Sequence, residues 1–267
     1  RTLLDGVPGL PYRYRLEARI SDVSNQIRAS EISTLVHPAS FYIGGRIEDA
    51  RGGWYTFLEQ GRKAACELVV IDPLGAEVPD AGAPGEIEAE LYRVTWKLAR
   101  QQGVAGRINS RWERTDELEY SSAVDPGEGR VEFTPEQSGR YYLRLTASDE
   151  VGRSAVTDVP FYSTGAEWVR WGGLDEDQIE LKPDKRIYEP GDTAKILVQT
   201  PLSEGDYLLT VEREGIISEE IISIEGSSRL IEVPVEAEYL PIVYVSLCSY
   251  TVRTGEPDHD YFSPDLD

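Results

Sequence analysis

Apolar and polar residues alternate with a period of two along most of the chain, and turn-forming residues interrupt the alternation at regular intervals. The segment YRYRLEARISD, from Tyr12, places aromatic and aliphatic side chains on one face and charges on the other. This period is typical of a β-strand, because successive side chains point to opposite faces. We therefore predict a half-buried strand, then a polar turn, SDVSNQ, and a second strand, IRASEISTLVHP, that ends at Pro38.

The middle of the chain continues this pattern. WYTFLEQ and KAACELVVID read as two strands broken at Gly61, and PLGAEVPDAGAPGE reads as a loop because it is rich in Pro and Gly. IEAELYRVTWKLARQQ contains good helix formers, yet its apolar positions alternate up to Leu91 and start again at Tyr92. This pattern favours a strand with one bulge over a helix. We expect more strands after it, separated at residues 125–129 and 135–139.

One segment of the pattern occurs twice. YRLEARISD, residues 14–22, resembles YYLRLTASD, residues 141–149. The similarity of these two segments indicates that the same hairpin closes two successive domains.

The last part of the chain has the sharpest strand signals. Pro190 fixes its backbone torsion, Gly191 can adopt a positive φ, and Asp192 can bond nearby amides, so a strand is expected to begin directly after them, at TAKILVQTP. DYLLTVERE and IISEEIISI are expected to form a hairpin about Gly215, followed by SRLIEVPVEAEYL and IVYVSLCSYTV. The 267 residues therefore predict an all-β chain of two or three tandem antiparallel β-sandwiches.

The net charge of the chain limits the classes of partner that it can bind. The formal charge of −21 repels phosphate backbones and anionic lipid surfaces, so we expect no nucleic-acid partner. No run approaches the roughly 18 apolar residues of a membrane-spanning helix, so we expect no membrane span. The chain has no Met, and we interpret it as a piece of something longer.

Catalytic and metal motifs are missing. His37, beside Pro38, is expected to be structural, and the acidic tail around His259 lacks the spacing of a calcium loop. Cys66 and Cys248 lie in apolar runs without metal or redox spacing, and buried free thiols are favoured over a disulfide between them. We find no nucleophile elbow or phosphate loop, and predict no catalytic residue, cofactor or metal, so not an enzyme.

The connector GAEWVRWGGLDEDQIE carries two tryptophans. Trp168 and Trp171 are candidates for an aromatic interface. Packing between adjacent domains is favoured over a stacking platform for a ligand.

Two stretches resemble a known family. LKPDKRIYEPGDTAKILVQTP, followed by LLTVEREGI, resembles the start of a macroglobulin-like domain of the bacterial α2-macroglobulin family, and YRYRLEARISDVSNQ running into VHPASFYIG resembles another domain ending in that family. The resemblance implies sandwiches of seven strands and about one hundred residues in a broad-spectrum protease inhibitor, a protease trap in which an attacking protease cuts an exposed bait region. Neither cysteine matches the family's Cys-x-Glu-Gln thioester motif.

The resemblance also implies boundaries and a setting. Residues 1–46 are expected to be the C-terminal part of one macroglobulin-like domain, residues 47–165 a second domain, and residues 166–267 a third that starts the part bearing the bait region. Arg253, Thr254 and Gly255 form the candidate protease-accessible segment. The implied partners are proteases, met through the full-length protein, and neighbouring domains of the same chain. The implied location is periplasmic or extracellular, with a lipid anchor upstream left open.

The alternative is a tandem β-sandwich module for carbohydrate binding or adhesion, with Trp168, Trp171 or Trp112 as its platform.

Overall fold

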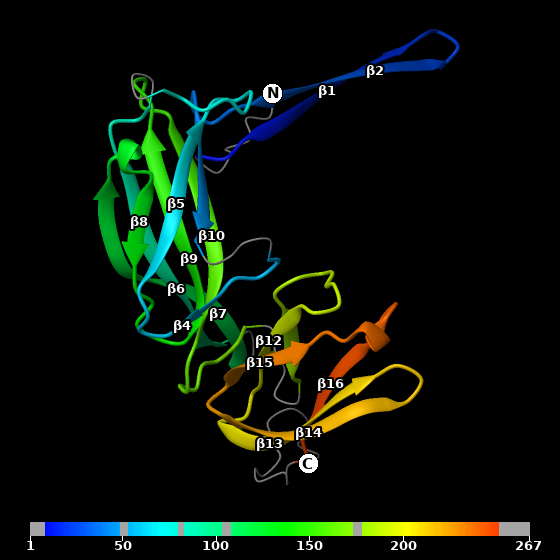
Figure 1. Ribbon diagram of the computed structural model, residues 1–267. Helices are drawn as coiled ribbons and strands as arrows, with labels where there is room; N and C mark the ends of the chain where they lie inside the picture. Colours follow the sequence, from blue (N-terminus) through cyan, green and yellow to red (C-terminus); the bar gives the residue numbers. More distant parts are fainter. Residues whose placement is uncertain (1–8, 49–52, 80–82, 103–107, 173–177, 251–267) are drawn as a thin grey trace.

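The computed structural model describes residues 9–48, 53–79, 83–102, 108–172 and 178–250. They form one separate hairpin and two β-sandwiches that follow one another along the chain (Figure 1). Every strand pair is antiparallel except that of β4 with β10. The predicted all-β fold of tandem antiparallel sandwiches is confirmed.

The hairpin consists of β1 (Tyr12–Ser21) and β2 (Ile27–Val36), joined over their full length from the Tyr12–Val36 pair to the Ser21–Ile27 pair. It projects away from the rest of the molecule (Figure 1). The prediction of a half-buried strand is wrong here: nearly all of β1 and all of β2 are exposed, because no second sheet among the described residues covers either face.

The first sandwich packs a five-stranded sheet, in the order β4-β10-β9-β6-β7, against a three-stranded sheet, β3-β5-β8. It therefore has one strand more than the seven expected. The strands are β3 (Tyr42–Ile47), β4 (Phe57–Glu59), β5 (Ala64–Ile71), β6 (Ile87–Gln102), β7 (Ile108–Val124), β8 (Arg130–Phe133), β9 (Gly139–Ser148) and β10 (Ser154–Thr164).

The core of this sandwich lies between its two sheets. Ile87, Leu91 and Leu143 are fully buried in the large sheet, and they share one core with Cys66 of β5 and with Phe41, which directly precedes β3. The predicted bulge in β6 is confirmed, because its register with β7 shifts between Leu91 and Tyr92.

The predicted domain boundary between residues 46 and 47 needs correction, because it falls inside β3. This strand pairs with β5 along its whole length, and Phe41 and Ile43 belong to the core of the first sandwich. The apolar residues of FYIGG thus begin the sandwich and do not end the preceding unit.

The second sandwich packs β11-β12-β15 against β14-β13-β16, around a core that includes the buried Tyr207. Its strands are β11 (Glu180–Pro183), β12 (Thr193–Gln199), β13 (Glu204–Glu212), β14 (Ile216–Glu225), β15 (Ser228–Pro234) and β16 (Tyr244–Cys248). The expected strand start after Pro190-Gly191-Asp192 and the expected hairpin about Gly215 are both present.

The repeated sequence gives the same turn in β1–β2 and in β9–β10. Asp22 Oδ1 accepts hydrogen bonds from the amides of Ser24 and Gln26, and Asp149 Oδ1 accepts them from Val151 and Arg153. The third residue after each Asp is left-handed: Asn25 with φ 58° and Gly152 with φ 81°. Asn and Gly tolerate this conformation best, which explains the spacing of the repeat.

Candidate functional site

The segment DKRIYEPGD at the start of the second sandwich is tied together by its own side chains. Asp184 Oδ1 accepts hydrogen bonds from the Tyr188 hydroxyl at 2.8 Å and from the Lys195 amide at 3.0 Å. Asp192 Oδ2 accepts from the Glu189 amide and from Lys185 Nζ, each at 3.2 Å. These bonds therefore fix the turn that precedes β12. Both carboxylates of the segment have a structural role.

These contacts shift two pKa values. The amide of Glu189 and then the ammonium of Lys185 lower the pKa of Asp192, because both favour the charged carboxylate. Burial raises the pKa of Tyr188 to about 12. Neither group is therefore set to exchange protons near neutral pH.

The same segment also reaches the first sandwich. The carbonyl of Asp184 accepts hydrogen bonds from the amides of Trp54 and Tyr55, and the guanidinium of Arg186 lies 3.4 Å from the centre of the Trp54 ring. Asp184 thus acts at two places: its carboxylate shapes the turn before β12, and its carbonyl holds the neighbouring sandwich.

A second contact joins the connector to the turn between β14 and β15. Ser227 is fully buried; its Oγ accepts a hydrogen bond from the Val169 amide at 2.6 Å, and its carbonyl accepts one from Trp171 Nε1 at 2.9 Å. Trp171 packs with Tyr162 of β10 and Leu197 of β12, so the cluster contains residues from both sandwiches.

All five tryptophans of the chain lie at this junction. Each makes a contact with the connector or across to the other sandwich: Trp54 with Arg186, Trp96 with Gly172, Trp112 with Arg170, Trp168 with the carbonyl of Pro201, and Trp171 with Ser227. We use the name tryptophan junction for these five residues and their partners.

The two tryptophans predicted as an aromatic interface differ in exposure. Trp171 is 7% exposed, whereas Trp168 is 51% exposed and is held by a 3.2 Å bond from Nε1 to the Pro201 carbonyl. The structure brings both to the junction. Trp54 and Ser227 were not singled out from sequence, and for Ser227 the sequence carries no signal, because its role comes from the turn in which it lies.

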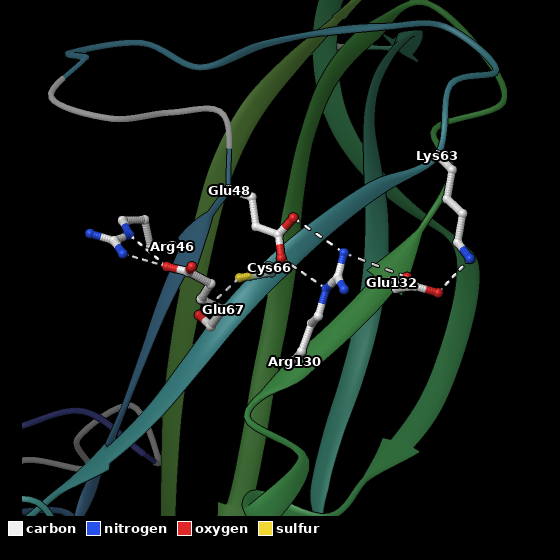
Figure 2. A network of polar contacts seen from close by, with 7 residues as sticks. All are labelled: Arg46, Glu48, Lys63, Cys66, Glu67, Arg130 and Glu132. Carbon is white, nitrogen blue, oxygen red and sulfur yellow. Dashed lines mark hydrogen bonds and ion pairs between the residues drawn. The ribbon is translucent and has the colours of Figure 1, made fainter.

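A network of charged side chains covers the outer face of β3-β5-β8 (Figure 2). It pairs three cations with three carboxylates: Arg46 with Glu67, Arg130 with Glu48 and Glu132, and Lys63 with Glu132. Lys63 lowers the pKa of Glu132 by hydrogen bonding to its charged form. Exposed pairs of this kind contribute little to stability, because water and salt screen them. All three carboxylates are paired, so none is set to act as a general base.

The thiol of Cys66 lies beneath this network and is fully buried (Figure 2). Burial raises its pKa to about 11, and its Sγ donates to the Glu67 carbonyl at 3.6 Å. A thiol in this state is neutral at pH 7 and is a poor nucleophile. Cys66 therefore packs as a small apolar residue, while Cys248 is an exposed free thiol on β16, which differs from the burial predicted for it.

The other predicted residues fall in two groups. His37 Nδ1 lies 2.6 Å from the Tyr42 hydroxyl, a contact that joins the hairpin to β3. Arg253, Thr254, Gly255 and His259 lie outside the described residues. Within the described part of the chain, no group of three His, Cys, Asp or Glu residues could hold a metal ion, and no helix is long and apolar enough to cross a membrane.

The chain is similar to known proteins of one family. The model of the α2-macroglobulin bait region domain matches residues 179–263. An α2-macroglobulin homolog of a Nostoc species is 29% identical over 251 residues, which cover 92% of this chain and 12% of that protein. A homolog of Deinococcus radiodurans is 27% identical, covering 93% of this chain and 22% of that protein. These matches support assignment of the chain to the α2-macroglobulin family.

The chain corresponds to a small part of its α2-macroglobulin relatives, less than a quarter of each of the two above. Two solved structures are also similar. Salmonella α2-macroglobulin reacted with methylamine gives a TM-score of 0.40 at 20% identity, covering 90% of this chain and 17% of that one. Native Escherichia coli α2-macroglobulin gives 0.41 at 19% identity, with the same coverage.

The α2-macroglobulin match begins at residue 179, next to β11, and takes in every strand of the second sandwich. The segment DKRIYEPGD, which carried the resemblance in the sequence, lies inside it. Its residues therefore have two physical uses within the matched region: they start β12, and they bond the first sandwich through Asp184 and Arg186.

Proposed function

We propose that this chain is a structural and interaction segment of a bacterial α2-macroglobulin-like broad-spectrum protease inhibitor. In this proposal its two sandwiches form a stiff frame next to a segment that an attacking protease cuts. The observation that carries the proposal is the match of the bait region domain to residues 179–263, which include both the second sandwich and the candidate segment at Arg253.

The physics of the frame supports this role. A protease must bind several residues in an extended, accessible form, and strands that are paired in ladders cannot offer them. β13 is paired on both sides, with β14 and β16, and β9 is paired with β10 and β6. The partners in this proposal are proteases, met by the full-length protein in the periplasm or outside the cell.

The chain contributes no covalent chemistry in this proposal. Cys66 is buried with a raised pKa, and its neighbours Glu67 and Leu68 do not form the thioester motif. Any capture by this segment would therefore be conformational.

The carbohydrate-binding alternative is not favoured by any contact. Its candidate platform residues are engaged at the tryptophan junction: Trp171 is buried, and Trp112 lies under Arg170, whose guanidinium is 3.6 Å from the ring centre. A sugar would have to displace these contacts before it could stack.

The test is a replacement in the full-length protein. Residues 251–267 are exchanged for a Gly-Ser linker of equal length, and inhibition of trypsin and elastase is measured with a protein substrate. The proposal predicts loss of inhibition with an unchanged melting temperature. The control replaces residues 23–26, the exposed turn of the hairpin, and is expected to inhibit normally. Full inhibition by the first variant would contradict the proposed position of the bait segment, and no inhibition by the unaltered protein would contradict the function itself.

A further inference from the structure

A cleft of about 380 Å³ lies between the two sandwiches. Tyr55 and Phe57 from the first sandwich and Leu230 from the second form the apolar part of its lining. Clefts of this size at a domain interface, with an apolar lining and a few polar groups, are the usual form of a ligand site. The cleft is distinct from the tryptophan junction, because none of the five tryptophans lines it.

The charged residues of the cleft favour an anionic ligand. The lining contains three cations and two carboxylates: Arg62, Lys63 and Lys195, with Glu59 and Asp184. The carboxylate of Asp184 is already used by the turn before β12. The ammonium of Lys195 has no ion pair or hydrogen bond within the described part of the chain. The lining thus carries a net positive charge in a chain whose net charge is −21, so it would attract carboxylates.

The cleft also contains an open strand edge. β4 is the edge strand of its sheet, and among the described strands it pairs only with β10. The carbonyl of Thr56 and the amide of Gln60 bond to β10. Main-chain groups alternate in direction along a strand, so those of Phe57 point away from β10. An open edge of this kind can add an extended peptide as a further strand.

These features together define the ligand: an extended segment for the edge, carboxylates for the cations, and an apolar side chain for the lining. Residues 254–267, TGEPDHDYFSPDLD, have all three, with five carboxylates, no Lys or Arg, and the adjacent Tyr261 and Phe262. The six residues between Pro257 and Pro264 contain no proline, so each can donate an amide to a strand edge.

We infer that residues 258–263 of this chain dock in the cleft between the sandwiches as an extended segment on the edge of β4. Asp258 and Asp260 share one face of such a segment and bind the cations, chiefly Lys195. The chain before them, which includes Arg253, stays outside the cleft. The inference rests on the charges and the strand edge, and it does not depend on the proposed function.

The position of this segment in the chain supports it as the occupant. It follows β16, the last strand of the second sandwich, after a few intervening residues. Residues 251–257 can span about 23 Å when extended, and the two sheets of a sandwich are only about 10 Å apart. A covalently linked segment also has a high effective concentration at the cleft, which favours it over the same segment of a second copy.

Carbodiimide coupling tests the docking directly, because it joins a lysine amine to a carboxylate that it touches. In the 267-residue chain we expect a crosslink from Lys195 or Lys63 to Asp258 or Asp260, mapped by mass spectrometry. The yield should not change on about tenfold dilution. Lys97, which pairs with Glu117, is the internal control and should not couple to the segment. Absence of the crosslink would overturn the inference, as would a yield that falls on dilution, since a second copy would then supply the segment.

Chymotrypsin gives a second readout, because docking shields Tyr261 and Phe262 while Arg253 stays free. We expect Lys195→Glu to speed chymotryptic cleavage after Tyr261 and Phe262 by at least about tenfold, since cleavage follows the population of the undocked form. Tryptic cleavage at Arg253 should keep its rate. Arg28→Glu makes the same charge change on the exposed strand β2 and should alter neither rate. Equal chymotryptic rates in the two variants would overturn the inference.

A charge exchange separates a direct contact from a general loss of stability. Asp258→Lys combined with Asp260→Lys should speed chymotryptic cleavage, and adding Lys195→Glu to this pair should slow it again. A combined variant that is cut as fast as the aspartate variant would overturn the assignment of the carboxylates to Lys195. None of these readouts measures protease inhibition, so their failure would leave the proposed function standing.

Discussion

Trp171 Nε1 donates a hydrogen bond of 2.9 Å to the carbonyl of Ser227. The two residues come from different parts of the chain, the connector after β10 and the turn between β14 and β15. This bond and the one from Val169 to Ser227 Oγ hold the connector on the second sandwich. With Trp54 and Asp184 on the other side, the two sandwiches are joined at separate points. The joint between the sandwiches thus depends on a few polar contacts, of which those to Ser227 are buried.

Ser227→Ala should destabilise the second sandwich. It removes the acceptor for the Val169 amide and leaves a buried N–H group unpaired, which costs about 1–3 kcal/mol in the free energy of unfolding. Urea unfolding followed by tryptophan fluorescence measures this loss, because all five tryptophans lie at the junction. The control is Ser218→Ala on the exposed part of β14, which is expected to change little. Equal stability of both variants would show that Ser227 does not hold the connector.

Gly226→Ala should be worse than the same change at another left-handed glycine. Gly226 has φ 77°, and a Cβ there would lie 2.4 Å from the carbonyl oxygen of Ala166 in the connector. Gly75 has φ 89° with nothing within 4 Å, so Gly75→Ala measures backbone strain alone, about 1 kcal/mol. We expect Gly226→Ala to lower the melting temperature further and to shift tryptophan emission to longer wavelength. If the two variants melt together, the connector is not in close contact with this turn.

The two cysteines should differ in reactivity. Cys248 is exposed, whereas Cys66 is buried with a pKa of about 11, so iodoacetamide at pH 8 should label one thiol in the native chain and two in urea. Mass spectrometry of the labelled peptides identifies the site. Cys248→Ser should show no native labelling, and rapid labelling of Cys66 in that variant would mean that the core of the first sandwich is open.

Stability should fall at alkaline pH. Burial holds the pKa of Cys66 at about 11, above its usual value of 9.0, and raises the pKa of Tyr142 and of Tyr188 to about 12. The unfolded chain releases these protons first, so the stability they contribute is complete below pH 9 and is lost as pH rises toward 12. Urea midpoints between pH 7 and pH 11 measure the slope. Cys66→Ala should reduce the slope between pH 9 and pH 11, and an unchanged slope would contradict the assignment to Cys66.

Much of the fold could be predicted from sequence because alternation depends on short-range geometry. The bulge in β6 was visible at Leu91 and Tyr92, where two apolar residues follow each other, and the start of β12 was visible in Pro190 and Gly191. The hairpin β1–β2 shows the limit of this reasoning. Its alternation indicates that one face is covered. The alternation does not show where in the chain the covering sheet would come from.

The junction was harder to predict, because long-range contacts leave little trace in a single sequence. Trp168 and Trp171 drew attention as aromatic residues in a polar connector. Their partners, the backbone of Pro201 and the turn at Ser227, come from segments that look ordinary. The boundary at residue 46 was wrong for a related reason: nothing in FYIGG shows that it pairs with residues 66–71 rather than with the hairpin before it.

Limited digestion with trypsin, chymotrypsin and elastase, mapped by mass spectrometry over time, tests most directly whether the chain is a resistant frame beside a cleavable segment. We predict that all three enzymes cut first within residues 251–267, where trypsin cuts at Arg253. Other early cuts should fall in loops. Large fragments holding β9, β12 and β13 should persist, and Arg253→Gln should remove the tryptic cut there without changing the chymotryptic pattern. Early cleavage within these paired strands, by enzymes of different specificity, would contradict it.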